Sequence, residues 1–248
     1  MTQTTPAATS YSRYERIYLL LASTFVVLLV LTNIIGIKLF RAPFNPDFAL
    51  TTGILVYPLT FVVTDLVSEI YGKKRADFMV LIGFLMSAVM LAVVQAAVWV
   101  DPHPYWVPGD NPFFPTEGEY QHAYRSVFSL NGILLVGSMS AYACAQLTDN
   151  WLYHFWKRRT NGKHLWLRNN GSTWVSQLVD TAVVNSILFY IGFGMEFMVG
   201  LKIMITIYLY KLLIAAVDTP LIYAGVYLIK RSLGVAWNED VVPPGESR

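Results

Sequence analysis

The sequence has few of the residues that soluble proteins use freely. Only 14% of its 248 residues are charged, whereas a soluble domain has about 25%. Hydrophobic residues make up 55% of the chain. This composition excludes an ordinary soluble enzyme and favours a protein that spans a lipid bilayer.

Other scarcities exclude further classes. One cysteine, Cys144, excludes a disulfide framework and a thiolate metal cluster. The four histidines contain no pair at zinc-ligand spacing, so we expect neither a metal nor another cofactor. A net charge of +2 is too small to indicate a nucleic-acid partner.

Apolar runs locate the expected spans. Residues 78–100 carry no charge, and as a helix they are about 35 Å long, enough to cross a bilayer with some tilt. Five further runs have few charges. The sequence predicts one all-α transmembrane domain, residues 1–248, with flexible tails at 1–12 and 233–248. Its six transmembrane helices are expected at about 17–37, 49–70, 78–100, 130–155, 172–193 and 202–229.

The distribution of Lys and Arg sets the expected orientation, because cytoplasmic loops carry an excess of both. One side of the six-span arrangement would hold 13 of them and the other only 4. The 13 are Arg13, Arg16, Lys73, Lys74, Arg75, Lys157, Arg158, Arg159, Lys163, Arg168, Lys230, Arg231 and Arg248. We therefore expect both termini in the cytoplasm. The proline-rich loop 101–121, on the other side, is interpreted as a stiff connector or as a lid over a substrate path.

Several polar residues fall inside the expected spans. An ionisable side chain there costs at least ~2.5 kcal/mol and usually faces a cavity or a partner. These residues form the predicted substrate-binding site: Asp65, Glu69, Gln146, Asp149, Gln177, Asp180 and Lys211, with Asn33 and Asn185 as outer members.

Four of these residues also have a purely structural interpretation. Asp149 and Glu69 are close enough to the ends of their spans to lie at the lipid headgroups. Asn33 can serve as an interhelical hydrogen bond, and Lys211 as half of a structural ion pair.

The spacing of the polar residues predicts shared faces. Asp65 and Glu69 are four residues apart, and Pro58 lies roughly on the same face, where it removes a backbone hydrogen bond. Residues 146–149 and 177–180 both read Q-L-x-D. In each motif the amide and the carboxylate lie on the same face of a helix. Together they can bind a flat heterocycle that has both hydrogen-bond donors and hydrogen-bond acceptors.

Short motifs in the same order carry a family resemblance. They are TNIIGIK at 32–38, YPLT at 57–60, TDLVSEIYG at 64–72, AQLTD at 145–149, LWLRNN at 165–170 with Ser172-Thr173, Gln177 with Asp180-Thr181, and Tyr210-Lys211 with Thr219-Pro220. Over roughly residues 30–225 the chain resembles the queuosine precursor transporter family, also called the vitamin uptake transporter family, of bacterial inner membranes.

The resemblance implies import of 7-deazaguanines such as preQ0 and preQ1. Asp180 would then accept the ring N–H donors, with Gln177 sharing the ring edge. Asp65 would be a second acid, and Lys211 would hold it or its neighbour ionised. Tyr57, Phe61, Tyr142 and Trp174 are candidates for stacking on the ring.

Alternatives remain open at this point. The chain can be a substrate-capturing subunit powered by a separate module. An intramembrane enzyme is disfavoured, because no Ser–His pair, H-E-x-x-H motif or catalytic Asp pair is present. Small residues at close-packing spacing, Gly83 with Ser87 and Ala215 with Ala216, make a homodimer plausible. The exact precursor and the coupling ion do not follow from the sequence.

Overall fold

The structure is a computed structural model. It describes residues 6–35, 38–42, 45–106, 113, 116–128, 132–161, 163–192, 194–237, 239 and 241. The α-helices are α1 (Pro6–Ile35), α2 (Tyr57–Tyr71), α3 (Lys73–Trp99), α4 (Glu117–Phe128), α5 (Gly132–Arg159), α6 (Leu165–Ser186) and α7 (Phe197–Leu233). Strands β1 (Leu39–Ala42) and β2 (Asn45–Thr51) form one antiparallel hairpin. Two 3₁₀ turns, η1 (Thr52–Leu55) and η2 (Pro104–Trp106), and a π-helical turn, η3 (Ile187–Gly192), complete the described elements.

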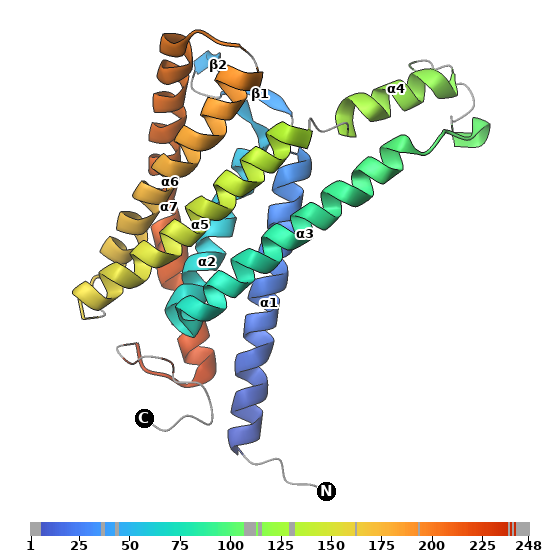
Figure 1. The fold of residues 1–248 in the computed structure, drawn as a ribbon. Helices are drawn as coiled ribbons and strands as arrows, with labels where there is room; N and C mark the ends of the chain where they lie inside the picture. Colours follow the sequence, from blue (N-terminus) through green and yellow to red (C-terminus); the bar gives the residue numbers. More distant parts are fainter. Residues whose placement is uncertain are drawn as a thin grey trace, which may run out of the picture.

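The helices run up and down through one bundle, with α2 at its centre (Figure 1). Both termini lie at the same end of the bundle, and the β1–β2 hairpin lies at the other end (Figure 1). The expectation of a helical membrane protein is confirmed. Four helical stretches of the described chain are long and apolar enough to cross a membrane: Arg13–Ile35, Lys73–Trp99, Leu165–Ile191 and Phe197–Leu233.

The second expected span is not one continuous helix, and this prediction was wrong. Residues 49–56 belong to β2, to η1 and to a single turn residue, and α2 has only 15 residues. At 1.5 Å per residue α2 is ~22 Å long, less than the ~30 Å of a hydrocarbon core. Pro58 lies in the first helical turn, where its missing N–H leaves no bond unmade. It therefore begins the helix and does not interrupt it.

The expected tails also differ from the structure. Helix α1 begins at Pro6, so residues 6–12 are helical. After α7 ends, the chain folds back, and the Lys230 ammonium donates to the carbonyl oxygens of Trp237 and Glu239 at 2.8 and 2.7 Å. Residues 1–5 and 242–248 lie outside the described residues.

Close helix packing explains three of the four small residues that suggested a homodimer, and the fourth, Ala216, is exposed. A Cβ on Gly83 would lie 2.5 Å from the Phe25 ring, so α1 packs directly on α3 there. Ser87 and Ala215 are buried inside the same chain. These three residues therefore serve intrachain packing and give no argument for a second copy.

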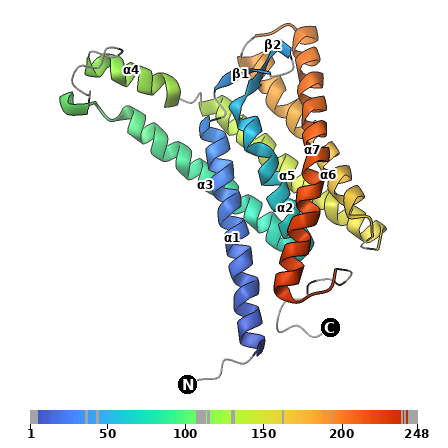
Figure 2. The ribbon, with the colours of Figure 1, turned by 180° about the vertical axis from the view of Figure 1, so that it is seen from behind.

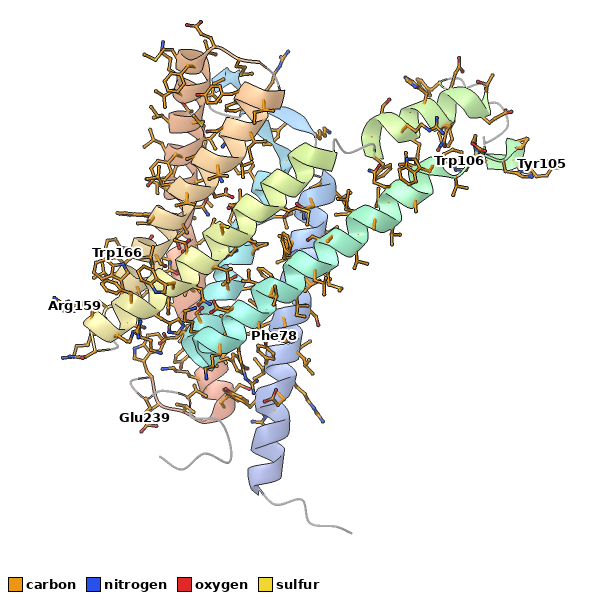
Figure 3. All side chains as sticks on the ribbon, viewed as in Figure 1. Phe78, Tyr105, Trp106, Arg159, Trp166 and Glu239 are labelled. Carbon is orange, nitrogen blue, oxygen red and sulfur yellow. The ribbon has the colours of Figure 1, made fainter. Side chains whose placement is uncertain are left out.

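The C-terminal part of helix α3 projects away from the bundle, and η2 and α4 lie on this projection (Figure 2). The Gln121 amide fixes α4 to this end by donating to the carbonyl oxygen of Val98 at 3.0 Å. Tyr105 and Trp106 lie at the far end of this projection (Figure 3). The described part of loop 101–121 is thus a connector held against α3 and covers no part of the bundle interior.

Candidate substrate site

A partly open cavity lies between α2, α6 and α7. Small-molecule sites are usually apolar with a few convergent polar groups, and the lining of this cavity has that composition. The lining residues are Ile54, Tyr57, Pro58, Phe61, Val62, Asp65, Asn169, Thr173, Gln177, Lys211, Ile214, Ala215, Asp218 and Ile222. Three predicted site residues, Asp65, Gln177 and Lys211, therefore meet at one cavity.

Four lining side chains have buried oxygens without a hydrogen-bond donor. They are both carboxylate oxygens of Asp65, Asn169 Oδ1, Thr173 Oγ1 and Gln177 Oε1. Each of these side chains is at most 4% exposed. A buried acceptor left without a donor costs about 1–3 kcal/mol. Such a concentration in one cavity is typical of a binding site that its ligand completes.

The polar wall comes from one face of α6. Asn169, Thr173 and Gln177 are four residues apart, so their side chains lie one above another along the helix. Sequence reasoning proposed Gln177 as a site residue but not Asn169 or Thr173. Asn169 lies before Ser172, where the expected span began, and Thr173 lies at the first turn of that span. The helix begins at Leu165, and the four-residue spacing of polar residues was the signal that could have identified them.

Asp180 does not line the cavity and is already paired. Lys211 Nζ lies 2.5 Å from Asp180 Oδ2, and the Tyr57 hydroxyl donates to the same oxygen at 3.0 Å. Lys211 also lies 4.7 Å from the centre of the Tyr57 ring. Of the two partners expected for Lys211, Asp65 or its neighbour, the structure pairs it with neither and instead with Asp180. Asp180 and Lys211 are equidistant from the turn between α6 and α7, so the antiparallel helices bring them together.

Glu69, one helical turn beyond Asp65, belongs to a buried ion-pair cluster. Its carboxylate accepts hydrogen bonds from the Tyr153 hydroxyl at 2.9 Å and from Arg168 Nη2 at 3.0 Å, and Lys157 Nζ is 3.4 Å away. The Arg168 side chain is only 3% exposed. Arg168 is thus not the loop cation that the sequence suggested. The cluster joins α2, α5 and α6 to one another.

Asp149 and Gln146 lie behind the cavity wall on α5, and both are fully buried. Asp149 accepts a hydrogen bond from the Ser176 hydroxyl at 2.9 Å. Asp149 is therefore a buried group that is hydrogen-bonded to α6.

The two outer members of the predicted site lie elsewhere. The Asn33 amide donates to Ser87 Oγ at 3.2 Å and lines a separate cavity between α1, α3 and α5. The Asn185 amide donates to the Thr181 carbonyl oxygen at 2.8 Å, within α6. Neither residue reaches the cavity that contains Asp65.

Two of the four candidate stacking residues line the cavity. The Tyr57 and Phe61 rings are both there, with their centroids 5.1 Å apart. Trp174 is 39% exposed and packs against Trp166. The side chain of Tyr142 lies outside the described part of the structure.

A cavity between apolar helices that contains a few convergent polar groups is the arrangement of membrane transporters, whose substrate sites lie within the bundle. The family model described as "Putative vitamin uptake transporter" matches residues 51–225. The chain belongs to this family. It is a transporter and not an enzyme, and a multi-pass protein of the bacterial inner membrane.

A curated relative supports the assignment. A protein of Bacillus subtilis (strain 168) named "Probable queuosine precursor transporter" is 29% identical over 180 residues, which cover 72% of each chain. No solved structure matches the chain.

Proposed function

We propose that the chain imports queuosine precursors, 7-deazaguanines such as preQ0 and preQ1, and binds them in the cavity between α2, α6 and α7. The proposal takes its substrate class from the relative's name. The observation that carries it is the set of buried acceptor oxygens without donors in that cavity.

The chemistry of the substrate complements this set. A deazaguanine presents adjacent N–H donors on one edge, which one carboxylate can accept together. Asp65 is the lining carboxylate with both oxygens free of donors, so Asp65 takes the role first expected of Asp180. Gln177, Asn169 and Thr173 bind the remaining polar edge, and Tyr57 and Phe61 pack against the ring face.

The charge of the cavity favours neutral or cationic substrates. Asp65 and Asp218 line it, whereas Lys211, the cation on the same wall, is paired with Asp180. The aminomethyl group of preQ1 is cationic, and its place is near the Asp218 carboxylate.

The direct test is binding and transport by the purified protein. We expect preQ0 and preQ1 to bind with higher affinity than adenine, which presents a different donor pattern. Proteoliposomes that contain this chain alone should take up labelled preQ0. Binding without uptake would instead identify the chain as a capturing subunit, and absence of binding would refute the proposal.

The orientation of the bundle is a second part of the proposal. Both termini and the positively charged turns after α2 and α5 belong to the cytoplasmic side. Reporter fusions after Gly72 and Lys163 should read cytoplasmic, and one at Asp101 should read external. A cytoplasmic signal at Asp101 would overturn the orientation.

A further inference from the structure

Buried apolar side chains lie between the cavity and the end of the bundle that holds both termini, here called the termini end (Figure 1). Along α7 the cavity lining ends at Ile222, which is 1% exposed and belongs to the main hydrophobic core. About one turn further toward the termini end lie Ile70 of α2, Leu165 of α6 and Val226 of α7, all buried in the same core. A substrate that leaves the cavity in this direction must displace them.

Two of the three cavity walls are fastened to each other at this level. Glu69 of α2 accepts hydrogen bonds from Arg168 of α6 and from Tyr153 of α5, so α2 and α6 form one unit with α5. Separating them would break a buried ion pair, which typically costs about 3–5 kcal/mol in other proteins. Among the described residues, α7 contributes no side chain to this cluster.

Helix α7 meets the other two walls here through weaker contacts. It packs closely on α2, because a Cβ on Gly225 would lie 2.8 Å from the Leu66 side chain. The backbone N–H of Trp166, in the first turn of α6, donates to the Tyr223 hydroxyl at 3.1 Å. These contacts separate without stranding a buried charge, so α7 is the wall that moves most easily.

Pro220 divides α7 at the level of the cavity. A proline has no N–H, so the carbonyl oxygen of Ala216 lacks its usual helical donor, and the helix can bend there. Directly before the proline, Thr219 is fixed to α6, because the Asn170 amide donates to its hydroxyl at 2.9 Å. A bend at Pro220 would therefore move residues 221–233 while the preceding part of α7 stays in place.

The chain beyond α7 holds residues 221–233 in their present position. The Lys230 ammonium, on a side chain that is buried, donates to the carbonyl oxygens of Trp237 and Glu239. The Trp237 ring stacks on the Tyr223 ring with centroids 5.9 Å apart, and Val241 packs against the main hydrophobic core. Glu239 lies at the termini end (Figure 3). This fold-back thus ties the last part of α7 to the rest of the bundle.

We propose that residues 221–233 of α7 form a gate between the cavity and the termini end, that the gate pivots at Pro220, and that Trp237, Glu239 and Val241 form a latch that holds it closed. The inference rests on the proposed function for the role of the cavity. The structure is the closed state of this gate. Opening bends α7 at Pro220, separates Ile222 from the other walls and breaks the contacts of the latch.

Thiol labelling in membrane vesicles measures the gate without a substrate. Cys144→Ser first removes the exposed native thiol. Ala215→Cys then places a reporter in the cavity, on the part of α7 that does not move. A membrane-impermeant reagent is applied from the face on which a separate Lys163→Cys variant is labelled, because Lys163 lies in the exposed turn between α5 and α6. This choice identifies the termini end whichever way the protein is oriented.

Weakening the latch should speed the labelling of the reporter, because the rate follows the population of the open state. Trp237→Ala removes the ring that stacks on Tyr223, and Tyr223→Phe removes only the hydroxyl that accepts from α6. Each should raise the rate by about 2- to 10-fold, the change expected for the loss of one hydrogen bond or a contact of similar strength. The matched control is Tyr227→Phe, at a tyrosine that is 52% exposed on the same part of α7.

A second variant tests the pivot. Pro220→Ala restores a backbone donor for the Ala216 carbonyl oxygen and should stiffen α7. Added to Trp237→Ala, it should return the labelling rate toward that of the reporter protein with neither change. Trp237 lies outside the helical bundle, so its replacement should leave the fold intact, and the mild Tyr223→Phe change gives an independent reading of the same gate.

The outcomes separate this inference from the proposed function. Labelling of Trp237→Ala and Tyr223→Phe at the rate of Tyr227→Phe would overturn the gate, even if the wild type takes up preQ0. A labelling rate that Pro220→Ala leaves unchanged would overturn the pivot. Faster labelling in both latch variants, in a protein whose wild type neither binds nor takes up preQ0, would support the gate and refute the proposed substrate.

Discussion

Asp65 and Glu69 stand one turn apart on α2, both buried, yet their surroundings differ completely. Glu69 is in contact with a hydroxyl, a guanidinium and an ammonium group, whereas neither oxygen of Asp65 has a donor. A buried acid with full partners stabilises the fold, and one without partners stores an unmet interaction that a ligand or a proton can supply. The position of an acid in a span therefore does not identify its role; its partners do.

The largest effect is expected at the partnered acid. Arg168→Ala removes a buried cation from Glu69, and breaking such a pair typically costs about 3–5 kcal/mol. Thermal unfolding in detergent should show a clear loss of stability. Arg158→Ala, at an exposed cation nearby, is the control.

A double variant tests the cause. If the stranded charge of Glu69 is responsible, Glu69→Gln combined with Arg168→Ala should be more stable than Arg168→Ala alone. Equal stability of the two would indicate that Arg168 acts through packing and not through its charge.

At the unpartnered acid we expect the opposite pattern. Asp65→Asn removes no protein hydrogen bond that another group relies on, so its thermal stability should stay near that of the wild type. Its affinity for preQ0 should fall by about 5- to 150-fold, the equivalent of about 1–3 kcal/mol for a lost partner. A variant that loses stability but binds normally would reverse the comparison between Asp65 and Glu69.

Asp180→Asn provides an intermediate case. It leaves Lys211 without its carboxylate, which should lower stability by about 1–3 kcal/mol. Because Asp180 does not line the cavity, affinity should fall less than in Asp65→Asn. Calorimetric binding together with thermal unfolding checks both parts, and an affinity loss larger than that of Asp65→Asn would restore Asp180 as the primary acceptor.

The sequence was sufficient for the helical membrane fold. It also identified Asp65 and Gln177, which line the cavity, because a polar side chain within a membrane span is costly and usually faces a cavity or a partner. It was not sufficient for the pairing of Lys211. That pairing depends on the register of α6 against α7, and the turn between them fixes this register. Asp180 and Lys211 lie 31 residues apart around that turn, so a correct turn position would have predicted the pair.

Helix α2 was predicted less well, because its apolar run continues from β2 through η1 and composition alone does not distinguish them. The hydrogen bond from the Tyr153 hydroxyl to Glu69 was equally beyond the sequence. It requires α2 and α5, which are separated by α3 and α4 along the chain, to lie side by side.

The smallest expected effect concerns Asn33, which sequence reasoning placed at the edge of the site. Its amide joins α1 to α3 through Ser87, and interhelical hydrogen bonds of this kind contribute about 0.6 kcal/mol on average. Asn33→Ala should therefore lower stability slightly and leave preQ0 affinity unchanged, because Asn33 lines a different cavity from Asp65. In a double-mutant cycle, Ser87→Ala should add little to Asn33→Ala, since either change alone breaks the same bond. Additive losses would mean that the two residues act separately, and a loss of affinity in Asn33→Ala would extend the substrate path from α2 to α1.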